Sequence, residues 1–360
     1  MILFGTRANI IRELNPILIA RLESDHFAIF IKTDNITNEK MDRICHQTYF
    51  HDSKQMSYVL RCGIYNITDP SKKVTYMLDQ AALAEISISS ESTVPYAVCN
   101  DALSQNYINQ RLFVSELDSA LDKSEFTPYF QPIVDSHTGE IVSAEALVSW
   151  NHSAKGRLSA EQFIPIFEKE GLTSKIACFM INNVLDFNIK RLEKGLKCIP
   201  CSVNLSRIDF YDAKLLDFIT QRLSNQEHVS EMLKIEITES SYAFLEANAL
   251  AFLDTIQRLN IDILLDDFGN GMSSLATLEQ YDFNVLKLDI GFVKKIGKNP
   301  KTEAIIRHII NLAHSMELKV VAEGVELDEQ LEFLRSANCD MIQGFYFYKP
   351  MPEEEFSKLI

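Results

Sequence analysis

Two adjacent carboxylates, Asp266 and Asp267, stand between a short aliphatic run and a glycine-containing turn in "ILLDDFGNGMSSL", residues 263–275. The aliphatic run has the composition of a buried strand. Neighbouring like charges at the end of such a strand repel each other and are costly to remove from water. Divalent cations bound between them would offset both costs, so the pair indicates a metal site.

Polar side chains recur at the carboxyl ends of the other aliphatic segments in the second half of the chain. They are Glu145, Asn204, Glu236 with Glu239, Lys287 with Asp289, Glu323 with Glu326, and Gln343. Any one of them could cap a helix or form a surface ion pair. As a set they offer oxygen ligands without histidine or cysteine, which suits Mg²⁺ or Mn²⁺.

The number of carboxylates favours two ions over one, bridged by one or both of the paired aspartates. Such a centre suits in-line attack of water on a phosphodiester, because it activates the water and neutralises the transition state. Lys287 could orient the water or stabilise developing charge. Gly269 and Gly271 would let the following loop bend close to the metals and bring Glu239 into place.

The elements that must position these residues are short β-type segments alternating with helical ones. The predicted strands are 127–134, 141–150, 201–206, 233–240, 262–268, 285–291, 318–325 and 341–347. Strands alternating with helices over this length predict an α/β fold, a (β/α)8 TIM-like barrel. Barrel enzymes keep their chemistry at the carboxyl ends of the strands, where the polar residues fall.

The first connection of the predicted barrel is too short for a parallel crossover. Only Asp135 to Glu140 separate the first two strands, whereas a parallel crossover needs a dozen or more residues. We therefore expect an antiparallel hairpin and a barrel with one reversed strand. Later in the chain, helical periodicity predicts an apolar face of Ile305, Ile309, Leu312 and Met316 in the helix at 302–316.

Composition excludes several classes of protein. A formal charge of −15 argues against broad binding to DNA or RNA. No apolar run approaches the length of a membrane span, and the first residues lack the layout of a signal peptide. Seven scattered cysteines suit a reducing cytoplasm, where we expect the protein. The C-x-x-C pair Cys198 and Cys201 has no second pair or nearby histidine, which favours a structural role.

Seven motifs occur in order: "EALVSW", "SVNLS", "IEITES", "LLDDFGNGMSSL", "LKLDIGFV", "VVAEGVE" and "IQGF". Together they resemble the EAL family of cyclic di-GMP phosphodiesterases over roughly residues 110–360. The resemblance implies a barrel with a reversed first strand. It also implies hydrolysis of cyclic di-GMP to linear pGpG with Mg²⁺ or Mn²⁺, and relatives that often act as homodimers.

The resemblance assigns roles to individual positions. The implied metal ligands are Glu145, Asn204, Glu236, Asp266 and Asp267. The implied catalytic residues are Asp267, which helps to activate water, Lys287, which contacts that water, Glu323, and Glu239, which anchors the mobile loop 268–274. The implied substrate side is made by Gln131, Leu147, Ser149 and Gln343.

Ser149 departs from the family pattern, which continues as E-A-L-x-R. An arginine there would hold a substrate phosphate by a bidentate contact that serine cannot make. Its loss would weaken binding by about 2–3 kcal/mol, the value of a buried charged hydrogen bond. Lys155 or Arg157 from the following loop could have taken its place.

The first part of the chain resembles the second half of a GGDEF diguanylate cyclase domain. Residues 16–32 predict two strands around the turn Glu23 to Asp25, 58–67 a further strand, and 74–89 a helix. In "ESDHF" only Asp25 and Phe27 match the signature, and Glu23 would repel phosphates. We therefore predict a degenerate, truncated GGDEF-like domain at 1–105, without cyclase activity, and an EAL domain at 106–360.

Two functions remain open at this point. The leading hypothesis is a metal-dependent cyclic di-GMP phosphodiesterase, because every expected metal ligand is present. The alternative is an impaired EAL domain that acts as a cyclic di-GMP receptor or a protein-interaction module, which Ser149 and the decayed cyclase half favour.

Overall fold

A computed structural model describes residues 13–23, 26–51, 54–89, 92–224, 227–242, 245–269, 278–279 and 281–360. The chain forms two compact units, Met1–Leu112 and Phe113–Ile360. Helix α4 (Asp101–Asp122) runs across the boundary between them.

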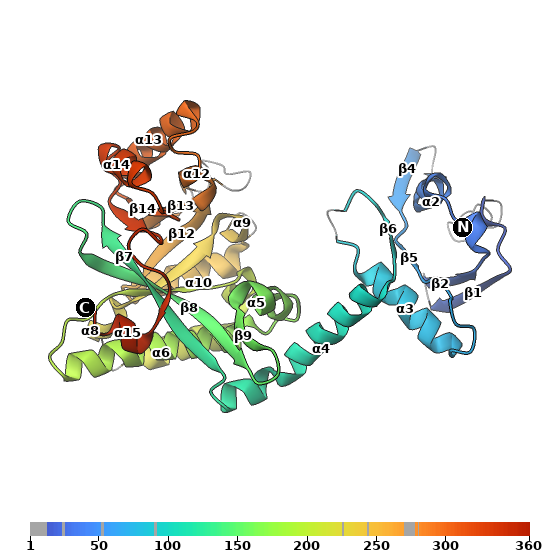
Figure 1. The fold of residues 1–360 in the computed structure, drawn as a ribbon, viewed down its shortest axis with the longest axis horizontal. Helices are drawn as coiled ribbons and strands as arrows, with labels where there is room; N and C mark the ends of the chain where they lie inside the picture. Colours follow the sequence, from blue (N-terminus) through green and yellow to red (C-terminus); the bar gives the residue numbers. More distant parts are fainter. Residues whose placement is uncertain are drawn as a thin grey trace. The chain divides into compact units, whose positions relative to one another are not determined.

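The larger unit is a closed barrel of eight strands (Figure 1). Its strands are β7 (Phe126–Asp135), β8 (Ile141–His152), β10 (Cys201–Asn204), β11 (Leu233–Thr238), β12 (Asp262–Phe268), β13 (Val285–Leu288), β14 (Lys319–Glu323) and β15 (Met341–Gln343). All eight predicted strands are confirmed, although several end earlier than expected. Asn204, Glu323 and Gln343 end their strands, and Glu239 and Asp289 follow theirs, whereas Glu145, Glu236, Asp266 and Lys287 lie within their strands.

The reversed strand is β7, which pairs antiparallel with both β8 and β15, while the other neighbouring strands of the barrel are parallel. A tight turn makes this hairpin possible. The backbone N–H of Gly139 donates to the carbonyl oxygen of Asp135 at 3.0 Å, and Gly139 has a φ of 74°, which favours glycine. The predicted hairpin and the mixed α/β barrel are confirmed.

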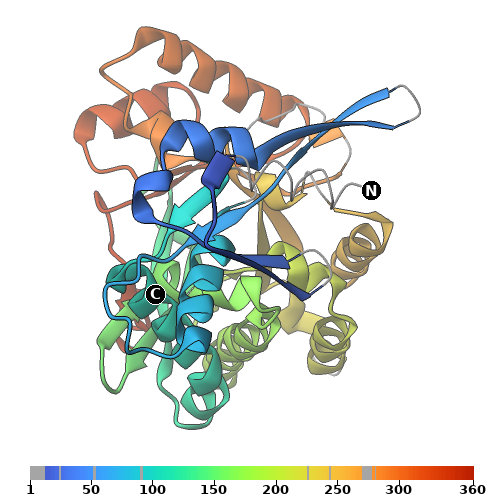
Figure 2. The same cartoon turned by 90° about the vertical axis from the view of Figure 1, so that its right-hand side faces the viewer.

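Helices surround the barrel and bury its outer face. They are α5 (Ala160–Lys169), α6 (Thr173–Glu193), α7 (Ala213–Leu223), α8 (Glu227–Ser230), α9 (Glu239–Tyr242), α10 (Ala247–Arg258), α12 (Ile290–Val293), α13 (Pro300–Ser315), α14 (Asp328–Ser336) and α15 (Glu353–Phe356), with a 3-10 helix at Arg207–Tyr211. Figure 2 shows the orange helices α13 and α14 along one side of the barrel. The barrel interior below the site is filled by Ile133, Leu264, Val285 and Val321.

The predicted apolar face of α13 is wrong by one position. Ile306, Ile310 and Ala313 are buried there, whereas Ile305 is 49% exposed. Two pairs of adjacent isoleucines occur in this helix. Since neighbouring residues of a helix point about 100° apart, the sequence offers two apolar stripes, and packing on the barrel selects one.

Two short strands that the sequence did not predict extend the sheet. Strand β9 (Gly156–Ser159) pairs antiparallel with the far end of β8, and β16 (Met351–Pro352) pairs antiparallel with β7. Strand β9 lies beside residues 149–152 of β8, and β16 lies beside Tyr129 and Phe130 of β7. They therefore bring the loop after β8 and the chain after β15 to the open end of the barrel.

Within its described residues, the smaller unit forms three two-stranded sheets. They pair β1 (Leu18–Glu23) with β2 (His26–Phe30), β3 (His46–His51) with β4 (Lys54–Val59), and β5 (Cys62–Ile64) with β6 (Tyr96–Val98), beside a 3-10 helix at Thr33–Asn35, α2 (Asn38–Cys45) and α3 (Val74–Ile86). In Figure 2 the β3–β4 hairpin is the long pair of blue strands that extends to the upper right. The single strand predicted at 58–67 is wrong, because β4 ends before β5 begins.

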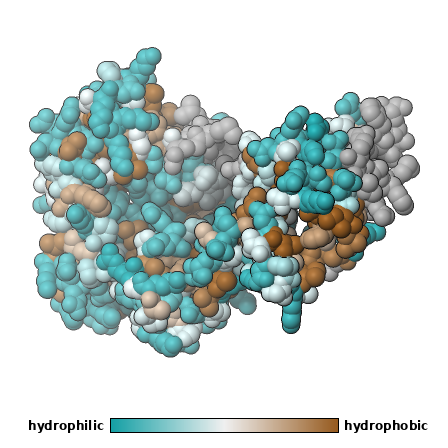
Figure 3. All heavy atoms as spheres, turned by 45° about the vertical axis from the view of Figure 1, so that its right-hand side comes forward, coloured by the Kyte–Doolittle hydropathy of each residue, from teal (hydrophilic) through white to brown (hydrophobic). Residues whose placement is uncertain are grey.

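The predicted turn of the smaller unit falls on Ser24 and Asp25, which lie outside the described residues. The predicted pair of strands and the predicted helix are confirmed as β1, β2 and α3. Leu18 and Phe30 face each other across β1 and β2, and they are 63% and 48% exposed. Figure 3 shows apolar side chains, in brown, on this unit. Across the described parts of both units, no helix is long and apolar enough to cross a bilayer.

Candidate active site

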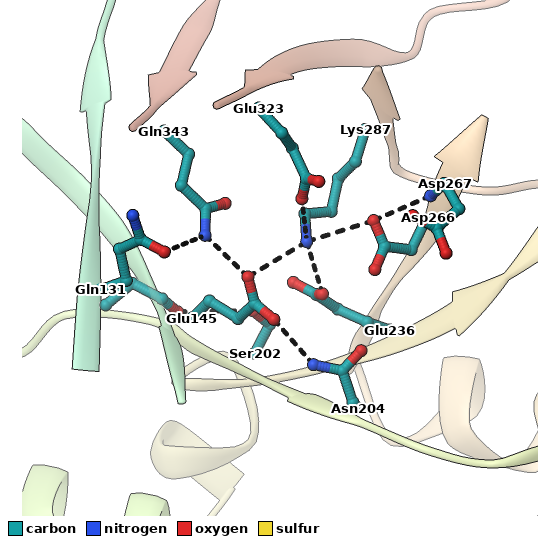
Figure 4. Close-up of polar contacts among 11 residues, drawn as sticks. Gln131, Glu145, Ser202, Asn204, Glu236, Asp266, Asp267, Lys287, Glu323 and Gln343 are labelled. Atoms are coloured by element: carbon teal, nitrogen blue, oxygen red, sulfur yellow. Dashed lines mark hydrogen bonds and ion pairs between the residues drawn. The ribbon is translucent and has the colours of Figure 1, made fainter. Parts of the chain in front are cut away.

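The ammonium group of Lys287 lies at the centre of the acidic residues at the carboxyl ends of the strands (Figure 4). Lys287 extends from β13 and is fully buried. Its Nζ atom lies 2.5 Å from Glu323, 2.6 Å from Glu236, and 3.3 Å from both Glu145 and Asp266. A buried lysine needs such partners, because an unpaired charge in the interior is very costly.

Glu145 is the best-bonded of these carboxylates. Its Oε1 atom accepts a hydrogen bond from Asn204 Nδ2 at 2.8 Å, and its Oε2 atom accepts one from Gln343 Nε2 at 2.7 Å. Gln343 also donates to Gln131 Oε1 at 3.1 Å, and Figure 4 shows this chain of contacts. The side-chain amides of Asn204 and Gln343 therefore hold the Glu145 carboxylate in one orientation.

Asp266 and Asp267 share the site because strand β12 contains a bulge. Successive side chains of a regular strand point to opposite faces. The pairing of β12 with β13 shifts between Leu265 and Phe268, and Asp267 has a φ of 56°. This left-handed conformation is uncommon outside glycine, although aspartate tolerates it better than most residues. Its N–H donates to Asp266 Oδ1 at 2.9 Å.

Three carboxylates stand close enough to hold one cation. Oxygen atoms of Asp266, Asp267 and Glu323 lie within 4.8 Å of one another. Burial raises the pKa of Asp267 to about 6, with a further contribution from Asp266. Burial also raises the pKa of Glu323 to about 8, against the opposing effect of Lys287. Crowding of negative charge is thus a property of this centre, and a cation would relieve it.

For the remaining groups of the site, burial and the neighbouring charges change the pKa in opposite directions. Burial opposes ionisation of Glu145, but Lys287, Gln343 and Asn204 hold its pKa below the usual value. Burial and the charge of Glu145 raise the pKa of Glu236 well above the usual value, despite Lys287. Burial would lower the pKa of Lys287, but its carboxylate neighbours raise it well above the usual value.

Two buried oxygen atoms of the site lack a hydrogen-bond partner among the described residues. They are Oε1 of Glu236 and Oε1 of Gln343. Buried acceptors are almost always satisfied by protein, water or an ion. An orphaned carboxylate oxygen beside an all-oxygen cluster fits a divalent cation, so these residues are compatible with the metals that the sequence predicts.

Glu239, at the start of α9, holds the segment that follows the paired aspartates. Its Oε2 atom accepts a hydrogen bond from the N–H of Gly269 at 3.1 Å. Gly269 has a φ of 96°, and a Cβ atom there would collide with the ring of Phe292 at 1.9 Å. Gly271 and the rest of the loop predicted to be anchored, from 270 to 274, lie outside the described residues.

Other predicted positions lie apart from this centre. Ser149 donates a hydrogen bond from Oγ to the carbonyl oxygen of Leu158 at 3.3 Å. Leu147 pairs with Tyr129 across the hairpin. Asp289 accepts a hydrogen bond from the N–H of Gly291 at 2.8 Å and so caps α12, while its charge contributes to the raised pKa of Asp267.

Sequence reasoning missed the bulge in β12 and the neighbours of Ser149 on β9. Aspartate tolerates a positive φ, but it also occurs with ordinary strand and helix dihedrals, so the residue types alone do not locate a bulge. The register of β12 against β13 reveals it only after both strands are placed. Strand β9 was hidden for a similar reason, since four residues carry too little periodicity.

The fold and the site define an α/β-barrel protein with one reversed strand and an acidic centre suited to divalent cations. The chain belongs to the EAL domain family, whose model matches residues 114–350. Members of this family use divalent metals, and the acidic cluster of Asp266, Asp267 and Glu323 is present here.

Among curated proteins, the chain is 29% identical over 343 residues to a bifunctional diguanylate cyclase/cyclic di-GMP phosphodiesterase, MucR of Pseudomonas aeruginosa. This match covers 94% of the chain and 50% of MucR. The cyclic di-GMP phosphodiesterase PdeR of Escherichia coli is 31% identical over 256 residues, which cover 70% of the chain and 38% of PdeR. The chain therefore spans half or less of the length of these relatives.

Solved structures show the same barrel. A MucR phosphodiesterase structure in complex with c-di-GMP is 32% identical, with a TM-score of 0.63, and the match covers 68% of this chain and 99% of that one. The EAL enzyme Bd1971, in a cAMP- and cyclic-di-GMP-bound form, is 30% identical with a TM-score of 0.65. That match covers 71% of this chain and 70% of Bd1971.

Proposed function

We propose that this protein hydrolyses cyclic di-GMP to linear pGpG in a reaction that depends on Mg²⁺ or Mn²⁺. The observation that carries the proposal is the contact of Lys287 with carboxylates from four different strands, beside an aspartate pair turned inward by a bulge. Two relatives that are named as cyclic di-GMP phosphodiesterases are 32% and 31% identical to this chain, and they support the choice of substrate.

The metal ligands in this proposal are Glu145, Asn204, Glu236, Asp266 and Asp267. When bound, two divalent ions supply a polarised water and neutralise charge on the phosphodiester. Glu323 lies beside the aspartate pair and would help it to hold an ion. The side chains of Asn204 and Gln343 hold Glu145 in place through the hydrogen bonds described above.

The chain's own groups then carry the proton and the charge. Water attacks phosphorus, the bond from phosphorus to the 3′ oxygen of one ribose breaks, and the phosphate stays on the 5′ side. The 3′ oxygen takes a proton from solvent and leaves as the ribose hydroxyl. Asp267, at the edge of the cluster, is placed to accept the proton of the attacking water. Lys287 offsets the negative charge that develops nearby.

The proposed substrate side is formed by Gln131, Leu147, Ser149 and Gln343, which lie on or next to the hairpin. The smaller unit is, in this proposal, the remnant of a GGDEF-like domain covering residues 1–105, with the EAL domain at 106–360. The match to bifunctional MucR over 94% of the chain supports it. Glu23 in place of glycine argues against cyclase chemistry in this remnant.

A second candidate function is a cyclic di-GMP receptor without turnover. Ser149 favours it, because its hydroxyl is engaged with the Leu158 carbonyl and makes no bidentate phosphate contact. The complete acidic set favours hydrolysis, since a receptor has no need to crowd these carboxylates around Lys287.

Incubation with cyclic di-GMP and Mn²⁺, followed by chromatography, distinguishes the two functions. We expect linear pGpG to accumulate with the wild-type protein. Glu145→Ala, which removes a predicted ligand, should form none. Binding of cyclic di-GMP without any product would support the receptor instead, and neither binding nor product would overturn both.

A further inference from the structure

The inner face of the hairpin continues outward from the acidic centre to strand β9. Because side chains alternate along a strand, Glu145, Leu147 and Ser149 of β8 share one face. Cross-strand partners lie on the same face, so Tyr129 of β7, opposite Leu147, belongs to it as well. So does Arg157 of β9, because it pairs with Asn151.

Arg157 is held over Tyr129 on this face. Its guanidinium carbon lies 4.9 Å from the centre of the Tyr129 ring, and its Nη1 atom donates to the Tyr129 hydroxyl oxygen at 3.2 Å. Arg157 is nevertheless exposed. A guanidinium that stacks on a ring keeps donors in its plane free to meet an anion.

The neighbouring cation, Lys155, points to the other face of the sheet. Its Nζ atom lies 5.7 Å from the centre of the Phe113 ring, which belongs to α4 and packs on Trp150 and His152. Trp150 and His152 alternate with Ser149 and Asn151 along β8, so they lie on the outer face. The structure thus separates the two cations that the sequence left equivalent.

We infer that Arg157, positioned by Tyr129, binds the phosphodiester of cyclic di-GMP that is not being cleaved. This inference rests on the proposed function. The acidic centre repels an anionic ligand wherever metal does not neutralise it, so a cation at the mouth is needed to hold the rest of the substrate. Tyr129 stands two residues outward from Gln131, about 7 Å along β7, so Arg157 is clear of the reacting atoms.

The role of Ser149 then changes. Its hydroxyl ties the end of β8 to the Leu158 carbonyl of β9, next to Arg157. A larger side chain at that position would lie between Leu147 and Asn151 on the same face. Serine therefore leaves room for the substrate to reach Arg157, and the phosphate contact expected from position 149 comes from β9.

The test is the affinity for cyclic di-GMP in Arg157→Ala, measured by isothermal titration in Ca²⁺, together with kcat and KM in Mn²⁺. We expect Kd and KM to rise about tenfold or more, as for loss of a charge-assisted hydrogen bond. We expect kcat to change little, because a contact remote from the reacting bond acts equally in ground and transition states. The Kd and KM of Arg157→Lys should lie between those of the wild-type protein and those of Arg157→Ala.

Arg307→Ala is the matched control. Arg307 stacks on Phe333 with 4.6 Å from its guanidinium carbon to the ring centre, on the outer helix α13, and donates to the Ser336 carbonyl. The substitution Arg307→Ala removes the same charge as Arg157→Ala, and it should leave the Kd for cyclic di-GMP unchanged. Equal Kd values for wild type and Arg157→Ala, or a fall in Tm without a rise in KM, would overturn the inference alone. A wild-type protein that fails to bind cyclic di-GMP would overturn the proposed function as well.

Discussion

The Nζ atom of Lys287 lies 2.6 Å from Oε2 of Glu236, and both side chains are fully buried. Neither charge could remain in the barrel interior alone, because the cost of an unpaired buried charge is several kcal/mol. The pair therefore couples the stability of the barrel to the charge state of its site.

Lys287→Met should destabilise the metal-free protein by roughly 3–5 kcal/mol, because it leaves the surrounding carboxylates without their cation. Turnover should fall by at least about 100-fold. Thermal unfolding in chelator and kcat in Mn²⁺ measure the two effects. Lys298→Met, at an exposed position, should change neither. An unaltered Tm in chelator would mean that Lys287 does not hold these carboxylates together.

Asp266→Asn should abolish hydrolysis while leaving the fold intact, because it removes a predicted ligand at the open end of the barrel. Asp262→Asn is the control, since Asp262 begins the same strand and pairs with Lys234 at 3.2 Å, away from the site. Product formation and far-UV circular dichroism give the answer. Near-normal turnover in Asp266→Asn would remove Asp266 from the ligand set.

Asp267 has a chemical and a conformational role that substitutions can separate. Asn tolerates a positive φ, so Asp267→Asn should keep the wild-type Tm and lose about 10²–10⁴-fold in kcat. Asp267→Val should lose activity and also about 1–2 kcal/mol of stability, because a β-branched residue is strained there. If both variants had the wild-type Tm, the bulge would not depend on the residue at this position.

Ca²⁺ should support binding of cyclic di-GMP but poor turnover compared with Mg²⁺ or Mn²⁺. It takes more ligands at longer distances than a compact pair of sites provides. Product formation in each metal, and in chelator, tests this expectation. Equal rates with Ca²⁺, or full activity in chelator, would argue against a two-metal centre.

Asp209 should make the barrel less stable as the pH rises. Burial raises its pKa to about 6, although Thr173 and the Ser206 N–H donate to it at 2.7 and 2.8 Å. Since the folded pKa exceeds the unfolded one, the folded state binds this proton more tightly. Its contribution is complete below about pH 4 and is lost as the pH rises through 6.

Denaturant unfolding of wild type and Asp209→Asn between pH 4 and 7.5 measures this effect. The wild-type protein should lose roughly 2–3 kcal/mol relative to the variant across that window. Asp217→Asn, at an exposed position of α7, should follow the wild type. Parallel pH profiles for wild type and Asp209→Asn would show that ionisation of Asp209 is not linked to folding.

The sequence by itself determined the barrel and its reversed strand. Strand segments rich in aliphatic residues are recognisable locally, and the six residues from Asp135 to Glu140 leave no room for a parallel crossover. That the acidic residues meet at one end of the barrel also followed, because barrel topology brings the carboxyl-terminal parts of its parallel strands together. These features depend on local pattern and chain length, which a sequence contains.

Tertiary structure alone decided which side chains meet. The buried stripe of α13 was settled by the barrel surface beneath Ile306 and Ile310, not by the helix itself. The bulge that turns both Asp266 and Asp267 inward exists only in the register of β12 against β13. Arg157 and Lys155 are equivalent as letters, yet Arg157 lies in β9 over the Tyr129 ring, whereas Lys155 lies in the turn before β9 over the Phe113 ring. Register and packing arise from contacts between distant segments, so no local pattern specifies them.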